Sequence, residues 1–490
     1  MVQQVRAHRP SELLPALARE GAGLFDGGPL RVDPAGLHPW VLAGLARESL
    51  AYGNEHRAAP VTAATVASLH NTYTALTDPF LRPDDGVGPW DLLLRTAYEQ
   101  LGWQGSVFGS LARFGAMFDR DFGAGYAVLG RGPLRELLGA DPGEYFGVAM
   151  LLTVSAQVNV GWFDPGWLDQ PQFADVLREL SRETVLDVFH GAYAEAFATV
   201  AARARADRNP EKELRKHDLN PLVATPYVRM PDGRYLAPAP TLVPDRASLA
   251  AVYFAGRDRW GDAFTVDLGR LVEAYAGEQL ALVPGATLTP ERTYGRGGGS
   301  LTVDWVMVLP DAVLLVEVKS ARVAQPGRLD AAGFHDDVKR DVGKGFRQVA
   351  ATAALLRDGH PVMGGVPTDL PVRGLIVTAE PHYLINNPVY RRGLPDPTVP
   401  TVVLSLEELE NGVSLSLRRP PGGVFLGLTD WEATEGVAVG AVLRREYEAS
   451  GLERWDNPIL DEAWARYPFG DDDPPLDGSP AEPDVSLGLG

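Results

Sequence analysis

The fold of this 490-residue chain is decided by the stretch LTVDWVMVLPDAVLLVEVK, which covers positions 301–319. Two short apolar runs flank a Pro-Asp pair that is typical of turns, so the stretch predicts a β-hairpin. If the turn is symmetric about this pair, Asp304 lies across from Glu317 and both side chains share one face. Lys319, two residues beyond Glu317, lies on that face too. A turn that is asymmetric by one residue would move Asp304 to the other face.

Two carboxylates and one ammonium group therefore converge among valine, leucine and methionine side chains, where unpaired charge is costly. A hard divalent cation between the carboxylates, with the lysine beside it, accounts for this pattern. The alternative is that Asp304 caps a strand while Glu317 and Lys319 form an ion pair on a sheet edge. Because the charges occur within a tight apolar hairpin, we favour the metal site over the ion pair.

Strand and helix patterns alternate around the hairpin, which predicts an α/β domain over residues 225–425 with a central mixed sheet flanked by helices. The spacing of apolar residues predicts helices over 246–257, 262–283 and 341–356, buried strands over 374–378 and 401–405, and a helix that Ser405 caps. A Pro-Asp-Gly sequence at 231–233 predicts a further hairpin over 226–236. We expect this hairpin to belong to the same domain.

Residues 1–209 carry apolar side chains at helical spacing and predict an all-α domain, whose longest helix spans 173–206. A charged, proline-containing segment at 210–224 is interpreted as a linker. Helical patterns recur in a C-terminal extension over 426–469, and the acidic Pro/Gly-rich segment 470–490 is expected to be disordered. The predicted fold class is thus multidomain, with an all-α part followed by an α/β part. Residues 1–209 show no catalytic constellation.

Composition limits the function further. The chain has no cysteine, which excludes disulfides, thiolate metal sites and cysteine nucleophiles, and which fits a reducing cytoplasm. Neither a signal peptide nor an apolar run long enough to cross a membrane is visible, so we expect a cytoplasmic protein. The net charge of −19 argues against non-specific binding of nucleic acid. Residues 319–347 depart from this balance with seven basic and four acidic side chains, which form either a solvated helix face or a surface for phosphates.

The motif Asp304…Glu317-Val318-Lys319 resembles that of the PD-(D/E)XK nuclease superfamily, which has the restriction-endonuclease-like fold. The resemblance covers about residues 225–412. The family places an acidic residue on a preceding helix, and Glu273 is the best match. Val303 stands where the family usually has a proline before the first aspartate.

The RecB-like branch of the family is similar in the helix that follows the lysine. This branch carries a glutamine there, which Gln348 matches, and a tyrosine four residues later, where this chain has Thr352. The resemblance implies that Gln348 steadies the site or contacts the nucleic-acid backbone. It also implies that basic residues of this helix meet neighbouring phosphates, and the candidates are Lys339, Arg340, Lys344 and Arg347. The alternative for Gln348 is an ordinary helix residue.

The implied activity is metal-dependent hydrolysis of phosphodiester bonds. Asp304, Glu317 and the backbone carbonyl of Val318 would hold Mg²⁺, for which Mn²⁺ should substitute, and a water made acidic by the ion would attack phosphorus. Lys319 would orient that water and stabilise the developing charge. Glu273 would reach the ion directly or through water, or help to bind a second ion. Its alternative is a plain glutamate on a helix surface.

Three functions therefore compete. The first is a deoxyribonuclease that acts as an endonuclease in bacterial defence or DNA processing, with RNA left open as a substrate. Its N-terminal half would recognise a protein partner, a signal or the substrate. The second is a catalytically inactive module on the same fold that binds nucleic acid or protein. The third is a scaffold whose acidic surface recruits basic partners. A homo-oligomer would make double-strand cuts natural, but the sequence points to no interface.

Overall fold

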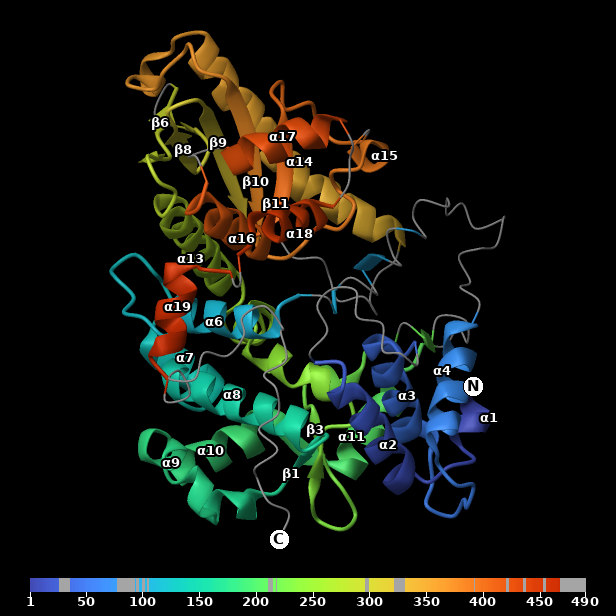
Figure 1. The fold of residues 1–490 in the computed structure, drawn as a ribbon. Helices are drawn as coiled ribbons and strands as arrows, with labels where there is room; N and C mark the ends of the chain where they lie inside the picture. The colour runs from blue at the N-terminus through green and yellow to red at the C-terminus, as the bar shows by residue number, and fades with distance from the viewer. Residues whose placement is uncertain are drawn as a thin grey trace.

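The computed structural model describes most of the chain. The described residues are 1–25, 36–76, 93, 97–98, 102–103, 105–209, 215–216, 218–295, 299–320, 331–391, 393–419, 423–434, 438–452 and 455–467. The predicted disordered segment 470–490 lies outside these ranges, as do residues 210–214 and 217 of the predicted linker 210–224. Within the described part, helices and two larger sheets make up a mixed α and α/β architecture (Figure 1).

A five-stranded mixed sheet forms the centre of the C-terminal half. Its strands lie in the order β11-β10-β9-β8-β5. The strands are β5 (Thr287–Pro290), β8 (Trp305–Val308), β9 (Val313–Lys319), β10 (Val372–Thr378) and β11 (Thr401–Ser405). The pairs β5–β8 and β8–β9 are antiparallel, whereas β9, β10 and β11 run parallel. The buried strands expected near 374–378 and 401–405 are therefore confirmed as neighbours in this sheet.

The β8–β9 hairpin has the symmetric register that its turn predicts. Trp305 pairs with Val316, and the ladder continues in step to the turn. By the same register Asp304, the residue before β8, lies across from Glu317 of β9. The asymmetric alternative, which would have sent Asp304 to the opposite face, is excluded. The register of the hairpin thus places the two carboxylates next to each other.

Helices cover both faces of the sheet. On one face, α13 (Asp262–Ala281) and α16 (Leu406–Ser416) share a hydrophobic cluster with Leu314 and Val316 of β9. On the other face, the long helix α14 (Ala331–Arg357) packs through Phe346 and Val349 against Leu315. Helix α16 starts with the predicted N-cap, because Ser405 and Glu408 form a capping box. The nearly continuous apolar run of β9, which is buried along almost its whole length, is what a strand covered on both faces requires.

The remaining helices surround this unit and build the N-terminal half. They are α1 (Val2–Val5), α2 (Pro10–Ala22), α3 (Pro39–Tyr52), α4 (Ala63–Thr74), α6 (Val107–Phe118), α7 (Arg131–Leu138), α8 (Pro142–Val158), α9 (Val176–Glu179), α10 (Arg182–Val188), α11 (Phe197–Ala206), α12 (Leu249–Trp260), α15 (Pro388–Arg391), α17 (Gly423–Thr434), α18 (Val439–Ser450) and α19 (Pro458–Ala465). A short ribbon, β6 (Thr293–Tyr294) and β7 (Ser300–Leu301), flanks the sheet. No helix in the described part of the chain is both long and apolar enough to span a membrane.

The prediction of an all-α N-terminal part was wrong. A four-stranded sheet with the order β1-β4-β3-β2 lies there. Its strands are β1 (Trp162–Phe163), β2 (Ala194–Ala196), β3 (Tyr227–Arg229) and β4 (Tyr235–Leu236). The predicted hairpin at 226–236 forms as β3–β4, but it pairs with β1 and β2 and not with the five-stranded sheet. Strands of two or three residues are too short to show an alternating pattern in the sequence.

The prediction of one long helix over 173–206 was also wrong. Leu180 is extended and ends α9, and the side chain of Ser181 then caps the start of α10. A π-turn at Phe189–Tyr193 leads into β2, whose backbone pairs with β3 before α11 begins. The apolar residues from Phe173 to Tyr193 pack into one core through separate short elements, whereas Phe197 and Val200 belong to a second core. Their regular spacing nevertheless suggested one helix.

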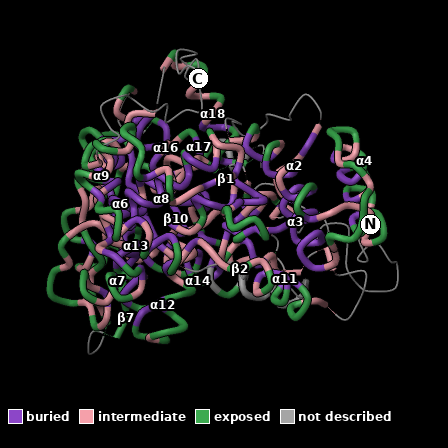
Figure 2. The backbone as a smooth tube through the Cα atoms, turned by 90° about the horizontal axis from the view of Figure 1, so that it is seen from below, coloured by how far each residue is buried: buried purple, intermediate pink, exposed green. Residues whose placement is uncertain are grey.

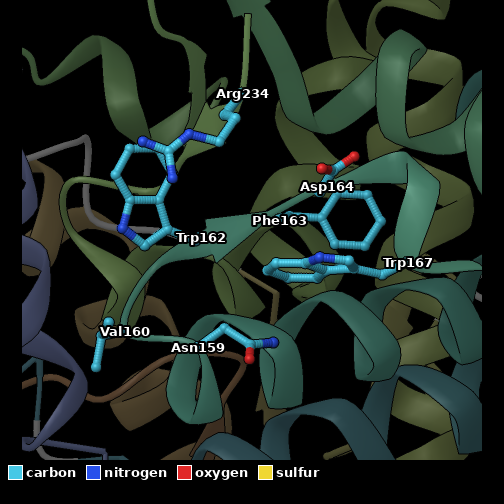
Figure 3. Close-up of a pocket in the computed structure, with 7 residues that line it drawn as sticks. All are labelled: Asn159, Val160, Trp162, Phe163, Asp164, Trp167 and Arg234. Atoms are coloured by element: carbon cyan, nitrogen blue, oxygen red, sulfur yellow. The ribbon is translucent and has the colours of Figure 1, made fainter. Parts of the chain in front are cut away.

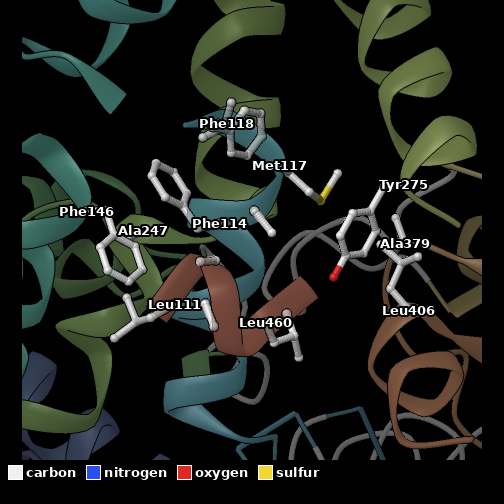
Figure 4. Close-up of a cluster of buried hydrophobic side chains, with 14 of the residues drawn as sticks. Leu111, Phe114, Met117, Phe118, Phe146, Ala247, Tyr275, Ala379, Leu406 and Leu460 are labelled. Atoms are coloured by element: carbon white, nitrogen blue, oxygen red, sulfur yellow. The ribbon is translucent and has the colours of Figure 1, made fainter. Parts of the chain in front are cut away.

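One hydrophobic core spans both sides of the predicted linker. It includes Phe114 of α6, Phe146 of α8, Tyr275 of α13 and Leu406 of α16. Figure 4 shows these side chains in one cluster, together with Leu460 of α19. Helix α19, near the C-terminal end of the described chain, packs beside α6 of the N-terminal half (Figure 1). Buried segments fill the middle of the molecule, and exposed ones lie mainly at its rim (Figure 2).

A buried polar network crosses the same core. Arg113 of α6 donates two hydrogen bonds of 2.6 Å to the carboxylate of Glu410 on α16. The hydroxyl of Tyr275 donates to the same carboxylate at 2.6 Å, and Gln279 donates to Tyr275 at 3.0 Å. Asn457 donates to Gln279 at 2.8 Å. Helix α13 is therefore fixed from one side by groups of the N-terminal and C-terminal segments.

Candidate active site

The candidate site lies where β9 ends, beside the residue that precedes β8. Glu317 is completely buried, and its Oε1 pairs with Nζ of Lys319. Its other oxygen, Oε2, is buried and has no hydrogen-bond partner. Asp304 is 9% exposed, and its Oδ2 accepts a hydrogen bond of 2.6 Å from the backbone N–H of Val318. Two carboxylates thus meet in a nearly dry environment, where Lys319 forms an ion pair with one of them.

Helix α14 places Gln348 beside the lysine. Its Oε1 accepts a hydrogen bond of 2.9 Å from Nζ of Lys319. The ammonium group is therefore held between Glu317 and Gln348, which use two of its three donors. Close packing of α14 on the sheet sets this distance, since a Cβ added at Gly345 would lie 3.2 Å from Ile376 of β10. The lysine is oriented by its neighbours before any substrate arrives.

Glu273 is brought to the site by the packing of α13 against the hairpin. The indole Nε1 of Trp305 donates a 3.1 Å hydrogen bond to the backbone carbonyl of Glu273. One turn later on the helix, Gly277 makes room for the indole, because a Cβ there would lie 2.3 Å from the Trp305 ring. The Glu273 side chain is half-buried, and it lies close enough to the Asp304 carboxylate for that charge to raise its pKa. The alternative of a plain surface glutamate does not describe this environment.

The electrostatics of the site reflect crowded negative charge. The pKa of Glu317 is raised to about 8, first by burial and then by the Asp304 carboxylate, against the opposing effect of Lys319. Burial also raises the pKa of Asp304, although the hydrogen bond from Val318 opposes the change. The pKa of Glu273 is raised to about 7 by burial and then by Asp304. A cation placed among these groups would relieve the cost of ionising them.

Two contributors were not found from the sequence. Glu291, which follows β5, lies close enough to raise the pKa of both Asp304 and Glu273. It lies on an irregular loop, where neither period nor motif indicates its position. Thr352 departs from the tyrosine of the RecB-like pattern, yet its buried hydroxyl accepts a 3.0 Å hydrogen bond from the backbone N–H of Val303. It thereby fixes the chain directly before Asp304.

Three of the four basic residues expected to meet phosphates have described side chains. Lys344, Arg347 and Arg340 are exposed on α14. Of these, Lys344 lies near enough to the site to lower the pKa of Asp304. The side chain of Lys339 lies outside the described part of the structure, and the role of the Val318 carbonyl stays a prediction. The exposed face of α14 is therefore basic next to the buried carboxylates.

The donor set fits a hard divalent cation. Among the described residues, no group of three or more His, Cys, Asp or Glu side chains could hold a metal ion. The site instead offers two carboxylates on the hairpin, and the buried Oε2 of Glu317 lacks a partner that an ion could supply. Mg²⁺ prefers oxygen ligands and keeps several waters when it binds one or two carboxylates. These residues are suited to such an ion.

Comparisons of the sequence with protein-family models and with curated proteins, and of the fold with solved structures, find no match for this chain. A function has to be argued from the residues themselves.

Proposed function

We propose that the chain is a metal-dependent nuclease that hydrolyses phosphodiester bonds, with DNA as the preferred substrate. The observation that carries the proposal is the buried, unpartnered Oε2 of Glu317 beside the Asp304 carboxylate. Replacing charged residues at such a position with apolar ones would be neutral or stabilising in many proteins. A chain that keeps two carboxylates and a lysine there has a use for them.

The order of elements supports the same proposal. The resemblance to the PD-(D/E)XK superfamily calls for a helix with an acidic residue, a hairpin with the Asp…Glu-x-Lys motif, and a helix with glutamine. Helices α13 and α14 and the β8–β9 hairpin follow in this order, and Glu273, Asp304, Glu317, Lys319 and Gln348 gather around the end of β9. A residue of each type therefore stands in the expected element.

Each residue has a defined part in the proposed reaction. Asp304 and Glu317 would hold Mg²⁺, which when bound makes water more acidic and offsets the charge of the transition state. Lys319, fixed by Glu317 and Gln348, keeps one N–H for the attacking water or a phosphate oxygen. Glu273 would add a third negative charge near the ion that Asp304 and Glu317 hold. The exposed Lys344 and Arg347 are suited to binding the phosphates of the strand.

We propose that the chain acts in bacterial defence or in DNA processing. Bacterial defence or DNA processing would suit a nuclease whose N-terminal half recognises a protein partner, a signal or the substrate. The large core shared by the two halves means that such recognition would act on a rigidly attached catalytic unit.

The test is cleavage of plasmid DNA and of single-stranded DNA with Mg²⁺ or Mn²⁺, compared with EDTA. Asp304→Ala, Glu317→Gln and Lys319→Met should each abolish cleavage. Glu278→Gln is a matched control, since Glu278 lies on α13 near Glu273 but pairs with Arg120. Cleavage that persists in Asp304→Ala, or that EDTA leaves unchanged, would contradict the proposal. Metal binding without cleavage of any DNA or RNA would favour the inactive binding module instead.

A further inference from the structure

A second site candidate is a pocket of about 260 Å³ in the N-terminal half. It lies where α8 ends and β1 begins, and the short 3₁₀-helix η2 (Pro165–Asp169) and Arg234, which precedes β4, complete it. Figure 1 places β1 and the β8–β9 hairpin at opposite ends of the molecule. The pocket is therefore separate from the candidate active site, and the inference below does not depend on the proposed nuclease activity.

The walls of the pocket are aromatic planes. Trp162 and Trp167 are both half-buried, and both line the pocket. Phe163, at the base, meets Trp167 edge-on with 6.3 Å between the ring centroids. Figure 3 shows Phe163 next to Trp167, whereas the Trp162 indole lies across the view from them, beside Arg234. Large aromatic side chains that stay half-exposed around a concavity offer stacking surfaces to a flat ligand.

Arg234 holds one of these planes in place. Its guanidinium group lies 4.1 Å from the centroid of the Trp162 ring (Figure 3). Asp232 in turn fixes the guanidinium group with a hydrogen bond of 2.9 Å. The arginine is exposed, so that its charge lies at the mouth of the pocket. An arginine in this position both orders the indole and presents a cation to an incoming anion.

Polar groups line the same space. Asn159 contributes a side-chain amide and Asp164 a carboxylate (Figure 3). Both residues are held locally, because Asn159 donates to Ser155 Oγ at 3.2 Å and Asp164 accepts from the backbone of Gly166 at 2.8 Å. A few fixed polar groups within a mainly apolar wall are typical of sites that recognise the edge of a small molecule.

The backbone beside the pocket is strained. Val160 has a φ of +47°, in the left-handed region that β-branched residues avoid. Gly161 follows with a φ of +89°, and a Cβ there would lie 2.6 Å from the carbonyl of Ala237. This tight reversal is what delivers Trp162 from the end of α8 into the pocket wall. Strain of this kind persists where the surrounding structure requires it and is concentrated at binding sites.

We propose that this pocket binds a nucleobase. A base is flat and stacks on tryptophan, its edge carries the donors and acceptors that Asn159 and Asp164 complement, and its attached phosphate suits Arg234. The base can belong to a free nucleotide or to an unpaired residue of a nucleic-acid strand. Both sources present the same chemistry to the pocket, and the experiment separates them.

The experiment is calorimetric titration of the full chain in EDTA, which prevents metal-dependent cleavage. The probes are AMP, GMP, CMP, UMP, ribose 5-phosphate and a single-stranded 12-mer DNA. At least one nucleotide or the 12-mer should bind, and ribose 5-phosphate, which lacks a base, should not. Binding of a mononucleotide identifies a free nucleotide as the ligand, whereas binding of the 12-mer alone identifies a strand.

Variants then locate the binding. Trp162→Leu should weaken it about 10- to 100-fold, the range expected for the loss of one stacking partner. Trp260→Leu is the matched control, because the guanidinium group of Arg259 lies 5.3 Å from the ring of this distant tryptophan. Arg234→Ala, at an exposed position, should weaken binding even if Trp162→Leu fails to fold. Absence of binding by every probe, equal binding of ribose 5-phosphate, or wild-type affinity in Arg234→Ala and folded Trp162→Leu would overturn the proposal.

Discussion

Lys319 donates a 2.9 Å hydrogen bond from Nζ to Oε1 of Gln348, and this contact joins the end of β9 to the middle of α14. The same ammonium group pairs with Glu317 of its own strand. The lysine is therefore positioned by one acceptor from the sheet and one from the helix. Loss of either acceptor should change where the charge of Lys319 points without changing the charge itself.

Gln348→Ala should lower the rate constant kcat for DNA cleavage about tenfold, which corresponds to about 1.4 kcal/mol of lost transition-state stabilisation. KM should change little, because Gln348 acts through Lys319 and not on the substrate. Gln348→Glu keeps an oxygen acceptor and should restore most of the rate. A change in KM with kcat intact would assign Gln348 to substrate binding, contrary to its proposed positioning role.

Glu317→Gln should make the metal-free protein more stable at alkaline pH. The pKa of Glu317 is raised to about 8 in the folded protein, whereas an unfolded glutamate titrates near about 4.3. The wild type is thus favoured at low pH and loses stability as pH rises towards about 8, because ionisation is then cheaper in the unfolded chain. The variant escapes this loss, which is on the order of 5 kcal/mol for a pKa raised from about 4.3 to about 8.

Urea unfolding in EDTA at several pH values between 5 and 8.5 measures this difference. Asp304 and Glu273 also have raised pKa values, so the variant should retain a weaker slope of the same sign. A stability advantage of Glu317→Gln that is the same at pH 5 and pH 8.5 would contradict the assignment.

Mg²⁺ should stabilise the wild type and should do so more at pH 8 than at pH 6, because it competes with protons for Asp304 and Glu317. A concentration of 100 times the dissociation constant raises the free energy of unfolding by about 2.7 kcal/mol. Thermal unfolding with and without Mg²⁺ measures the shift. Asp304→Asn should lose most of it, whereas Glu278→Gln on α13 should keep it. Equal shifts in both variants would place the ion elsewhere.

Gly277→Ala should lower both stability and cleavage. A Cβ at this position would lie 2.3 Å from the Trp305 ring, so α13 must move away from the hairpin and carry Glu273 with it. Overpacking of this kind costs about 1–3 kcal/mol. Gly427→Ala on α17 is the matched control, since nothing lies within 4 Å of a Cβ added there. That change should be neutral or stabilising by about 0.5–1 kcal/mol.

Denaturation and cleavage rates of the two glycine variants should therefore diverge. Similar stability of Gly277→Ala and wild type would mean that the indole of Trp305 can rotate away without consequence for α13.

The hairpin was predictable from the sequence because local chemistry determines it. Pro310-Asp311 sets a symmetric turn, and the side-chain period of two then places Asp304 and Glu317 on one face. Helix α14 was expected for the same reason, since its apolar spacing is strong. Non-local features were not accessible. Glu291 lies near the site because of the course of the loop after β5. Position 277 requires a glycine because the Trp305 ring, from a distant segment, packs against it.

The small N-terminal sheet was missed for a related reason. Its strands β1 and β2 span two and three residues, and they exist because β3 and β4 offer them partners. No window of sequence around Glu195 or Phe163 contains that information. The break at Leu180 comes directly before Ser181, whose side chain caps α10. The prediction relied on the apolar spacing, which continues across this break.

A buried hydrogen-bond network joins the two halves of the chain through Arg113, Glu410, Tyr275 and Gln279. The two halves therefore have to be inherited together. Expression of residues 225–425 alone would leave Glu410 buried without its arginine and would expose the face of α13 that α6 covers. The segment that carries the candidate site therefore cannot be transplanted onto another domain, as separable modules can. Recombination within this gene would have to exchange α6, α13, α16 and α19 together to yield a folded product.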